Sequence, residues 1–331
     1  VLVAGALLAG PAAAQEPVRE AWQLDWGNGA QTVIIEFRPW DLTLGPPLGL
    51  TCSWAGAHCN GNDVAITFGT QNALYAASTL LLNPGDEALV LEPCFTTYRA
   101  TIESTGARAV TVPCLPELGW QPNMSTLEAS ITPHTRAIYF ASPANPTGAA
   151  ISEANLTTIA ELAVAHDLWI VSDEIYCDFI FDGAHHSIAA LPGMAERTII
   201  VGSLSKSHAM TGWRVGWAIG PEAFVRHATA LNLALSYGAA GFIQEAAAVA
   251  IEQRLPEVDA MRERFRERRD LVMAALSNTP SSTRAKSAGF MAWQRRRGAR
   301  PGRRRGPGSP LACRGARHLA VDGGRLRPVA S

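Results

Sequence analysis

The sequence predicts an α/β protein whose core is a mostly parallel sheet of seven strands flanked by helices. From Asp63 to about Gly220, short apolar runs alternate with helical stretches, and this alternation is typical of parallel sheets covered on both faces. Polar and glycine-rich motifs follow several of the strands, at the edge where such sheets bind ligands. The size agrees, because 331 residues, 47% of them hydrophobic, can bury a large core and suggest two domains.

The elements are expected in a regular order along the chain. Strands are predicted over residues 64–68, 88–92, 109–112, 137–141, 168–172, 198–202 and 215–219. Helices are predicted over residues 71–82, 94–104 and 152–166, and a longer helical stretch over 241–276. The last stretch contains the run MRERFRERRD, whose charges are most simply explained as the solvated face of a helix.

Charge and cysteine content argue against several classes of protein. The net charge is −1, so no overall field recruits nucleic acid or an anionic membrane, and neither is an expected partner. The six cysteines form no CxxC pair, and their spacing suggests neither a zinc site nor a dense disulfide framework. We therefore expect no bound metal and a reduced, cytoplasmic setting.

The two ends of the chain differ from the rest. Residues 1–15 resemble the apolar region and cleavage site of a secretory signal, in conflict with a cytoplasmic location, and a mistranslated or fragmentary start explains them equally well. Residues 294–331 hold eleven arginines among many glycines and prolines. A nucleic-acid-binding tail, a disordered tail and translation in the wrong frame are the alternatives, and the abrupt change in composition favours the third.

The central motif is Ser203-Leu-Ser205-Lys206, followed by an arginine at position 214. Only two lysines exist in the chain, Lys206 and Lys286, so a reaction that needs a side-chain amine has two candidates. A strand would deliver Lys206 to the edge of the sheet, where burial lowers the pKa of a lysine and makes it a nucleophile. The two hydroxyls and Arg214 could bind a phosphate dianion, although most lysines simply lie on the surface.

A second motif, Gly69-Thr70-Gln71, lies at a junction between a strand and a helix. The glycine permits a tight turn, and the first N–H groups of the helix can then bind an anion. A turn with a helix cap is the simpler explanation of this motif alone.

Two further motifs follow strands. Asn145 lies between prolines in SPANPTG, where it could donate a hydrogen bond to a ligand oxygen, or could belong to an ordinary loop. Asp173 in SDEIY would end a buried strand and would need a partner such as a protonated pyridine nitrogen. Tyr176 follows three residues later and could bind the same ligand. A helix cap is the alternative role for Asp173.

Together these motifs resemble the class I and II aminotransferases, which have the type I fold of enzymes that use pyridoxal 5′-phosphate (PLP). The matching segments are GTQNAL (69–74), NPGDEALVLEPCFTTY (83–98), SPANPTG (142–148), SDEIY (172–176) and SLSKSHAMTGWRVGW (203–217), within roughly residues 63–293. Several motifs in the right order are far more specific than one. The segments SLSKSHAMTGWRVGW and LPGMAERT (191–198) are most similar to the arginine–pyruvate members of the family.

The resemblance implies a role for each site residue. Lys206 would carry PLP as a Schiff base and act as the general base and acid, Asp173 would keep the pyridine nitrogen protonated, and Tyr176 and Asn145 would bind the phenolic oxygen. Phe95 would stack on the ring. The phosphate would be held by Gly69, Thr70, Gln71, Ser203, Ser205 and Arg214. The Asn145–Pro146 bond is expected to be cis.

The resemblance also implies a reaction and an organisation. An amino acid and a 2-oxo acid such as pyruvate would exchange an amino group by a ping-pong mechanism, in a homodimer. We expect an atypical segment over residues 1–60, a large PLP-binding domain over 61–245, a connecting helix with the start of a smaller, incomplete α+β domain over 246–293, and an atypical tail over 294–331.

Three expected features are missing: a G-x-P-x-F-type stretch, a tyrosine lent to the neighbouring subunit, and an arginine that clamps the substrate carboxylate. Arg325 and Arg327 do not match the last of these convincingly. Cofactor binding is therefore expected to be better preserved than turnover. The alternatives are another PLP enzyme of this fold, such as a C–S lyase, decarboxylase or racemase, an inactive cofactor-binding copy, and, ranked low, a PLP-binding regulator of DNA.

Overall fold

The computed structural model describes residues 63–253 and 255–277, with side chains as far as residue 274, and six short strands outside this range. Those strands form two small antiparallel sheets: β1 (Leu24–Asp25), β2 (Gln31–Val33), β3 (Ser53–Trp54) and β4 (Ala57–His58) in one, and β13 (Leu319–Asp322) and β14 (Arg325–Pro328) in the other. The predictions for the remainder of residues 1–60 and 278–331 lie outside the described residues.

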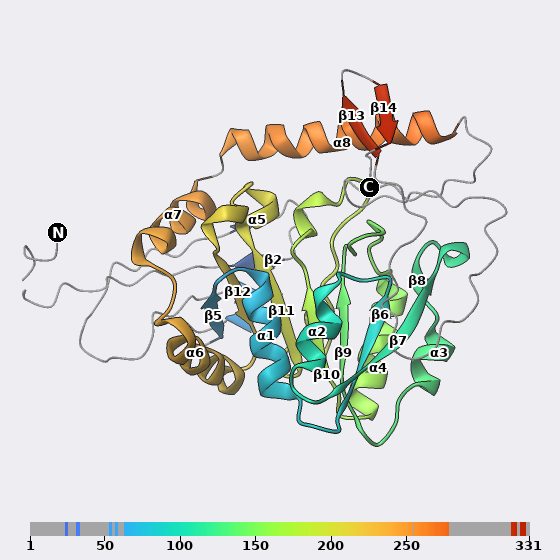
Figure 1. Cartoon of the computed structure of the whole chain (residues 1–331), viewed down its shortest axis with the longest axis vertical. Helices are drawn as coiled ribbons and strands as arrows, with labels where there is room; N and C mark the ends of the chain where they lie inside the picture. The colour runs from blue at the N-terminus through green and yellow to red at the C-terminus, as the bar shows by residue number, and fades with distance from the viewer. Residues whose placement is uncertain are drawn as a thin grey trace, which may run out of the picture.

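The main sheet confirms the predicted α/β class (Figure 1). Its strand order is β5-β12-β11-β10-β9-β6-β7-β8. The pairs from β11 through β10, β9 and β6 to β7 are parallel, whereas β12 runs antiparallel to both β5 and β11. The strands are β5 (Val64–Thr67), β6 (Glu87–Glu92), β7 (Arg108–Leu115), β8 (Gln121–Pro122), β9 (Thr135–Ala141), β10 (Trp169–Asp173), β11 (Thr198–Ser203) and β12 (Gly216–Ile219).

All seven predicted strands are present, and β8 is an eighth strand that the sequence did not predict. It pairs antiparallel with β7 over only two residues, Gln121 and Pro122. The turn between them contains Gly119 and Trp120, both with positive φ. A strand this short has too few residues to show an alternating pattern, so periodicity could not reveal it.

Two hydrophobic layers cover the sheet, because neighbouring residues of a strand point to opposite faces. Val90 faces α1 (Thr70–Leu81), α2 (Thr97–Glu103) and α6 (Glu222–Ser236). Leu89, the preceding residue, faces α3 (Met124–Ala129) and α4 (Glu153–Ala165). The strands of the parallel core are therefore buried on both faces, as parallel sheets require.

The helices differ from the prediction at several places, and neither α3 nor a short helix over Leu204–Ser207 was predicted. The predicted helix 94–104 begins only at Thr97, after a turn at Thr96. Helix α6 was not predicted. The single stretch expected over 241–276 is two helices, α7 (Gly241–Glu252) and α8 (Pro256–Ser277). Pro256 explains the break, since proline fits the first turn of a helix but disfavours helical backbone at the residue before it.

Helix α7 packs with the sheet. Its Ala247, Ala250 and Ile251 are buried in a cluster with Val64 of β5 and Val215 next to β12. The predicted domain boundary after residue 245 falls inside this helix. Within the range that the structure describes, no helix is both long and apolar enough to span a lipid bilayer.

Candidate active site

Three adjacent parallel strands end at one place, and each is followed by a predicted site residue. The loop with Asn145 follows β9, Asp173 is the last residue of β10, and Lys206 lies in the short helix α5 (Leu204–Ser207) directly after β11. In the register of the sheet, Asp173 pairs with Ala141 of β9 and with Val201 of β11. The sheet thus brings these three motifs together at its carboxyl edge, the usual place of a ligand site in this class of fold.

Asp173 is fully buried and accepts two hydrogen bonds. Tyr98 Oη donates to Asp173 Oδ2 at 2.6 Å, and the backbone N–H of Ile175 donates to Oδ1 at 3.1 Å. Burial raises the pKa of Asp173 to about 6, against the effects of these two hydrogen bonds and of the charge of Lys206. Asp173 is therefore a buried acid close to the amine of a partly buried lysine.

Tyr98 was not predicted as a site residue from the sequence. It lies in the quoted segment EPCFTTY, in the first turn of α2, and Phe95, three residues earlier, precedes the helix. The ring centroids of Phe95 and Tyr98 lie 6.4 Å apart, edge to face. Tyr98 is completely buried, whereas Phe95 is 39% exposed. The helical spacing was visible in the sequence, but the partner across the sheet was not.

Asn145 and Tyr176 are neighbours, as a shared ligand requires. Asn145 Nδ2 lies 3.5 Å from Tyr176 Oη, the length of a weak hydrogen bond. Burial, followed by the charge of Asp173, raises the pKa of Tyr176 to about 12, so its hydroxyl keeps its proton at neutral pH. The Asn145–Pro146 bond is cis, which confirms the expectation from the resemblance.

The predicted phosphate residues come together from two distant motifs. Arg214 Nη2 donates to the carbonyl oxygen of Phe68 at 2.8 Å, which places the guanidinium against Gly69. Gly69 has a φ of +81°, and a Cβ atom at this position would lie 2.8 Å from Arg214 Nη2. Arg214 itself has a positive φ of 54°, a conformation that most residues avoid. The contact therefore depends on glycine at position 69.

Helix α1 begins at this contact. It has no side-chain cap and no acidic residue in its first turn, so its positive end stays uncompensated by the chain. Thr70 Oγ1 is buried and has no hydrogen-bond partner among the residues that the structure describes. A buried hydroxyl without a partner is costly, and a ligand acceptor would satisfy it. Gln71, the next residue, accepts a hydrogen bond from Thr97 Oγ1 at 2.6 Å through its Oε1.

The two serines before Lys206 are buried and linked to each other. Ser203 Oγ accepts from the backbone N–H of Ser205 at 3.3 Å, which caps α5. Thr211 Oγ1 donates to the carbonyl oxygen of Ser205 at 2.8 Å, and Arg214 donates to the carbonyl oxygen of Thr211 at 3.0 Å. One chain of hydrogen bonds thus connects α5 to Arg214, and so the lysine to the cradle at Gly69.

A polar cluster supports β10 from behind. Glu174, buried next to Asp173, accepts hydrogen bonds from Ser172 and Ser187 and contacts His185 Nε2 at 2.7 Å. Burial opposes protonation of His185, but the charge and hydrogen bond of Glu174 outweigh it and raise the pKa of His185.

Helix α8 holds the segment that follows Tyr176. Arg262 donates to the carbonyl oxygens of Asp178 and Ile180, each at 2.7 Å. Arg269 binds Asp182 at 2.6 Å and lies over the ring of Phe181, 5.0 Å from its centroid. The interpretation of the whole charge run as a solvated face is therefore wrong for Arg269, whose side chain is only 12% exposed, whereas Arg262 is exposed as predicted. Arg266 fits it, since its partners are Glu263 and Asp270 of the same helix.

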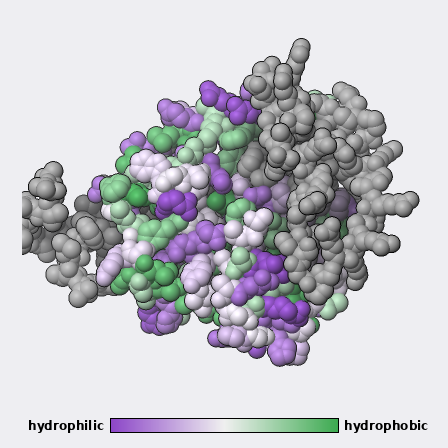
Figure 2. Space-filling view, in the orientation of Figure 1, coloured by the Kyte–Doolittle hydropathy of each residue, from purple (hydrophilic) through white to green (hydrophobic). Residues whose placement is uncertain are grey.

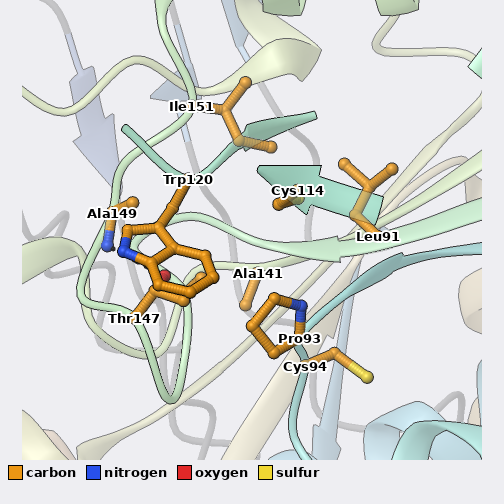
Figure 3. Close-up of a pocket in the computed structure, with 10 residues that line it drawn as sticks. Leu91, Pro93, Cys94, Cys114, Trp120, Ala141, Thr147, Ala149 and Ile151 are labelled. Atoms are coloured by element: carbon orange, nitrogen blue, oxygen red, sulfur yellow. Dashed lines mark hydrogen bonds between the residues drawn. The ribbon is translucent and has the colours of Figure 1, made fainter. Parts of the chain in front are cut away.

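A small cavity lies beside the loop that carries Asn145 (Figure 3). Figure 3 shows the indole ring of Trp120 next to Thr147 and Ala149, with Pro93 and Cys94 on the opposite side. Burial raises the pKa of both Cys94 and Cys114 to about 12, so neither thiol is reactive at neutral pH. This cavity does not include Asp173 or Lys206 among its lining residues and is not the reaction centre.

The residues at the carboxyl edge fit PLP. The buried acid suits the ring nitrogen, and the amine suits the aldehyde. The pair of neutral donors suits the phenolic oxygen. The buried hydroxyl and the arginine beside a glycine suit the phosphate. The structure does not test the predicted substrate residues in the same way. The expected N-terminal features lie outside the described residues, and the side chains of Arg325 and Arg327 in β14 are not described.

Comparison with known proteins gives one consistent family. The family model "Aminotransferase class I and II" matches residues 53–304. Over 226 residues the chain is 50% identical to an arginine–pyruvate transaminase of Pseudomonas aeruginosa, covering 68% of this chain and 58% of that protein. It is 40% identical over 217 residues to a probable N-succinyldiaminopimelate aminotransferase of Mycobacterium tuberculosis, covering 65% of this chain and 55% of that protein.

Solved structures agree with these relatives. The N-succinyldiaminopimelate aminotransferase of Mycobacterium tuberculosis matches with a TM-score of 0.65 and 38% identity, over 69% of this chain and 60% of that one. An aromatic aminotransferase of Pyrococcus horikoshii matches with a TM-score of 0.67 and 34% identity, over 69% and 61%. The chain spans less than two thirds of each of these relatives. It belongs to the class I and II aminotransferases.

Proposed function

We propose that this chain is a PLP-dependent aminotransferase that moves an amino group from an L-amino acid to a 2-oxo acid. The observation that carries the proposal is the meeting of Lys206, Asp173 and the pair Asn145–Tyr176 at the ends of three adjacent strands. An ordinary surface lysine would not have its charge act on a buried acid, as the charge of Lys206 acts on Asp173.

Each residue has a proposed task. PLP supplies an aldehyde that takes up the amino group and a ring that accepts electrons when its nitrogen is protonated. Lys206 would hold the aldehyde, and its amine would move the proton of the substrate Cα as general base and acid. Asp173 would hold the ring nitrogen through its negative charge, and Phe95 would cover the ring. Asn145 and Tyr176 donate hydrogen bonds to the phenolic oxygen.

The phosphate is assigned to the cradle between α1 and α5. The residues proposed to hold it are Gly69, Thr70, Gln71, Ser203, Ser205 and Arg214. Thr70 supplies the strongest support, because its buried hydroxyl has no partner in the described part of the chain. The positive end of α1 and the guanidinium of Arg214 supply the charge that a dianion requires.

Arginine and pyruvate are the proposed substrates. The support is the 50% identity to the arginine–pyruvate transaminase. The two half-reactions balance, since the donor leaves as its 2-oxo acid and pyruvate leaves as alanine, so the kinetics should be ping-pong. The other relatives, named for N-succinyldiaminopimelate or aspartate, define the competing donors.

A spectrum of the purified chain with PLP tests the proposal. We expect an absorbance band of bound cofactor that borohydride fixes to Lys206, and bleaching of this band by L-arginine that pyruvate reverses. Alanine formed from pyruvate should equal the arginine consumed. A lyase or decarboxylase would release product without consuming pyruvate. A bound band that no amino acid bleaches would support the cofactor site and contradict turnover.

We also propose that two copies of the chain form a homodimer. Large apolar side chains are exposed on α6, on α7 and between them, at Leu233, Leu235, Tyr237, Phe242 and Val249, and Tyr237 is 92% exposed. Figure 2 shows apolar patches on the side of the molecule where these helices lie. Apolar side chains that gather at a surface mark an interaction site. Analytical ultracentrifugation of the unmodified chain should show a dimer. The double variant Tyr237→Asp with Phe242→Asp should be a monomer. A monomeric unmodified chain would contradict the proposal.

A further inference from the structure

The hydrogen bond between Tyr98 and Asp173 joins two elements that are distant in the sequence. Tyr98 lies on α2, which follows β6, and Asp173 ends β10, with β9 between the two strands. The Oη–Oδ2 distance is 2.6 Å, which is typical of a hydroxyl that donates to a carboxylate. Both side chains are buried, so water does not compete for this contact.

The groups that act on Asp173 come from three places in the chain. Tyr98 on α2 and the N–H of Ile175 donate hydrogen bonds, Lys206 on α5 contributes a positive charge, and Glu174 contributes a negative one. The charge of Asp173 in turn helps to raise the pKa of Tyr176, after burial. Burial raises the pKa of Asp173 to about 6, and the hydrogen bond from Tyr98 is the first of the effects that lower it.

Tyr98 can act on Asp173 only as a donor. Burial, and then the charge of Asp173, raise the pKa of Tyr98 well above its ordinary value. The phenol therefore keeps its proton throughout the neutral range, and its hydrogen bond favours the ionised carboxylate. With Tyr98 bound to Oδ2 and the N–H of Ile175 bound to Oδ1, each oxygen has a fixed donor, and the plane of the carboxylate is set.

We propose that Tyr98 is a positioning residue that keeps Asp173 ionised and oriented toward the cofactor's ring nitrogen. The part that concerns the cofactor rests on the proposed function. One proton is shared between the carboxyl group and the ring nitrogen, and the hydrogen bond from Tyr98 stabilises the state in which the nitrogen holds it. Without the hydroxyl, Asp173 would retain this proton and the ring would accept electrons less well.

Tyr98→Phe tests the proposal, with Tyr139→Phe as its matched control. Tyr139 is equally buried in the same core cluster, and its hydroxyl pairs with Ser78 at 3.2 Å instead of an acid. Each substitution removes one buried hydroxyl and leaves the ring in place. Only the first should change the ionisation of Asp173.

The first measurement is the thermal unfolding of the chain without cofactor between pH 4 and pH 8. Because the pKa of Asp173 is raised to about 6 on folding, its contribution to stability is full below its unfolded value and is lost as pH rises through 6. Tyr98→Phe raises this pKa further, so the variant's deficit relative to the unmodified chain should grow between pH 5 and pH 8. The deficit of Tyr139→Phe should not change with pH.

A second variant shows whether the effect passes through the acid. In the background Asp173→Asn, Tyr98→Phe should have a deficit that is independent of pH, because no carboxyl group remains to titrate. A pH-independent deficit with Asp173 present would overturn the proposal. So would a pH-dependent deficit that persists when Asp173 is asparagine.

The second measurement uses PLP labelled with ¹⁵N in its ring. We expect the nitrogen signal of Tyr98→Phe to move toward that of unprotonated pyridine, and the affinity for PLP to fall about tenfold or more, as for the loss of a hydrogen bond to a charged group. Tyr139→Phe should match the unmodified chain. An unchanged nitrogen signal in Tyr98→Phe overturns the inference and leaves the proposed function intact. If the unmodified chain binds no PLP, the proposed function fails, and the pH series still decides the coupling.

Discussion

Gly69 and Arg214 are in direct contact across the start of α1, although 145 positions separate them in the chain. A Cβ atom on Gly69 would lie 2.8 Å from Arg214 Nη2, closer than two such atoms can approach. The contact joins the glycine-rich motif to the arginine that follows Lys206. Because the arginine occupies the space that a side chain at position 69 would need, the shape of the cradle depends on both residues.

Gly69→Ala should therefore displace Arg214 and weaken cofactor binding. The positive φ of Gly69 adds a backbone cost of about 1–2 kcal/mol for any residue with a Cβ atom. Gly85→Ala is the matched control, because Gly85 has a φ of +90° with nothing within 4 Å of the added atom. Both variants should lose stability in thermal unfolding, but only Gly69→Ala should lose affinity for PLP in an absorbance titration. Equal affinities would contradict the assigned cradle.

Lys206→Ala should abolish the covalent adduct with PLP. Loss of its acid–base role alone lowers rates by about 10²–10⁴-fold. The control is Lys286→Ala, which changes the only other lysine of the chain. Mass spectrometry after borohydride reduction should find a pyridoxyl group at position 206 in the unmodified chain and in Lys286→Ala. A pyridoxyl group in Lys206→Ala would show that another amine carries the cofactor.

Tyr176→Phe should raise the pH at which the bound cofactor's absorbance band changes. Tyr176 keeps its proton because burial raises its pKa to about 12, so at neutral pH it can donate to an ionised oxygen. Loss of a donor to the charged form disfavours that form, by roughly one pKa unit for an interaction of about 1.4 kcal/mol. A pH titration of the band measures this shift. An unchanged midpoint would remove Tyr176 from the proposed contact with the phenolic oxygen.

Arg269→Ala should destabilise the segment that follows Tyr176. The side chain of Arg269 is 12% exposed, contacts the ring of Phe181 and binds Asp182, so its loss should cost about 1–3 kcal/mol. Arg266→Ala is the control on the same helix, since Arg266 pairs only with exposed acids of α8 and should change stability little. Urea unfolding compares the two. Equal losses would show that α8 does not hold this segment.

His185 should make stability depend on pH above the ordinary pKa of histidine. Its pKa is raised on folding because Glu174 outweighs the effect of burial. A raised pKa stabilises the fold fully below the unfolded value of His, and this contribution is lost as pH rises through the folded value. His185→Gln should therefore lose stability relative to the unmodified chain at pH 6 and less at pH 9. A difference that stays constant across this range would contradict the pairing.

The sequence by itself determined the class of fold, the seven main strands and the order of the motifs along the chain. Alternation of apolar and helical stretches is a local property, so it can be seen without knowing what each strand pairs with. The sequence also placed Asp173 and Lys206 at strand ends, because the strands that precede them are apolar and end abruptly at polar residues.

Only the tertiary structure decided which residues meet. Tyr98, which follows β6, reaches across β9 to Asp173 at the end of β10. This strand order is set by pairings between segments that are distant in the sequence. The same holds for Arg214 against Gly69 and for Arg262 on the carbonyl oxygens of Asp178 and Ile180. Periodicity records which face of an element is buried, but it carries no information about the partner that covers that face.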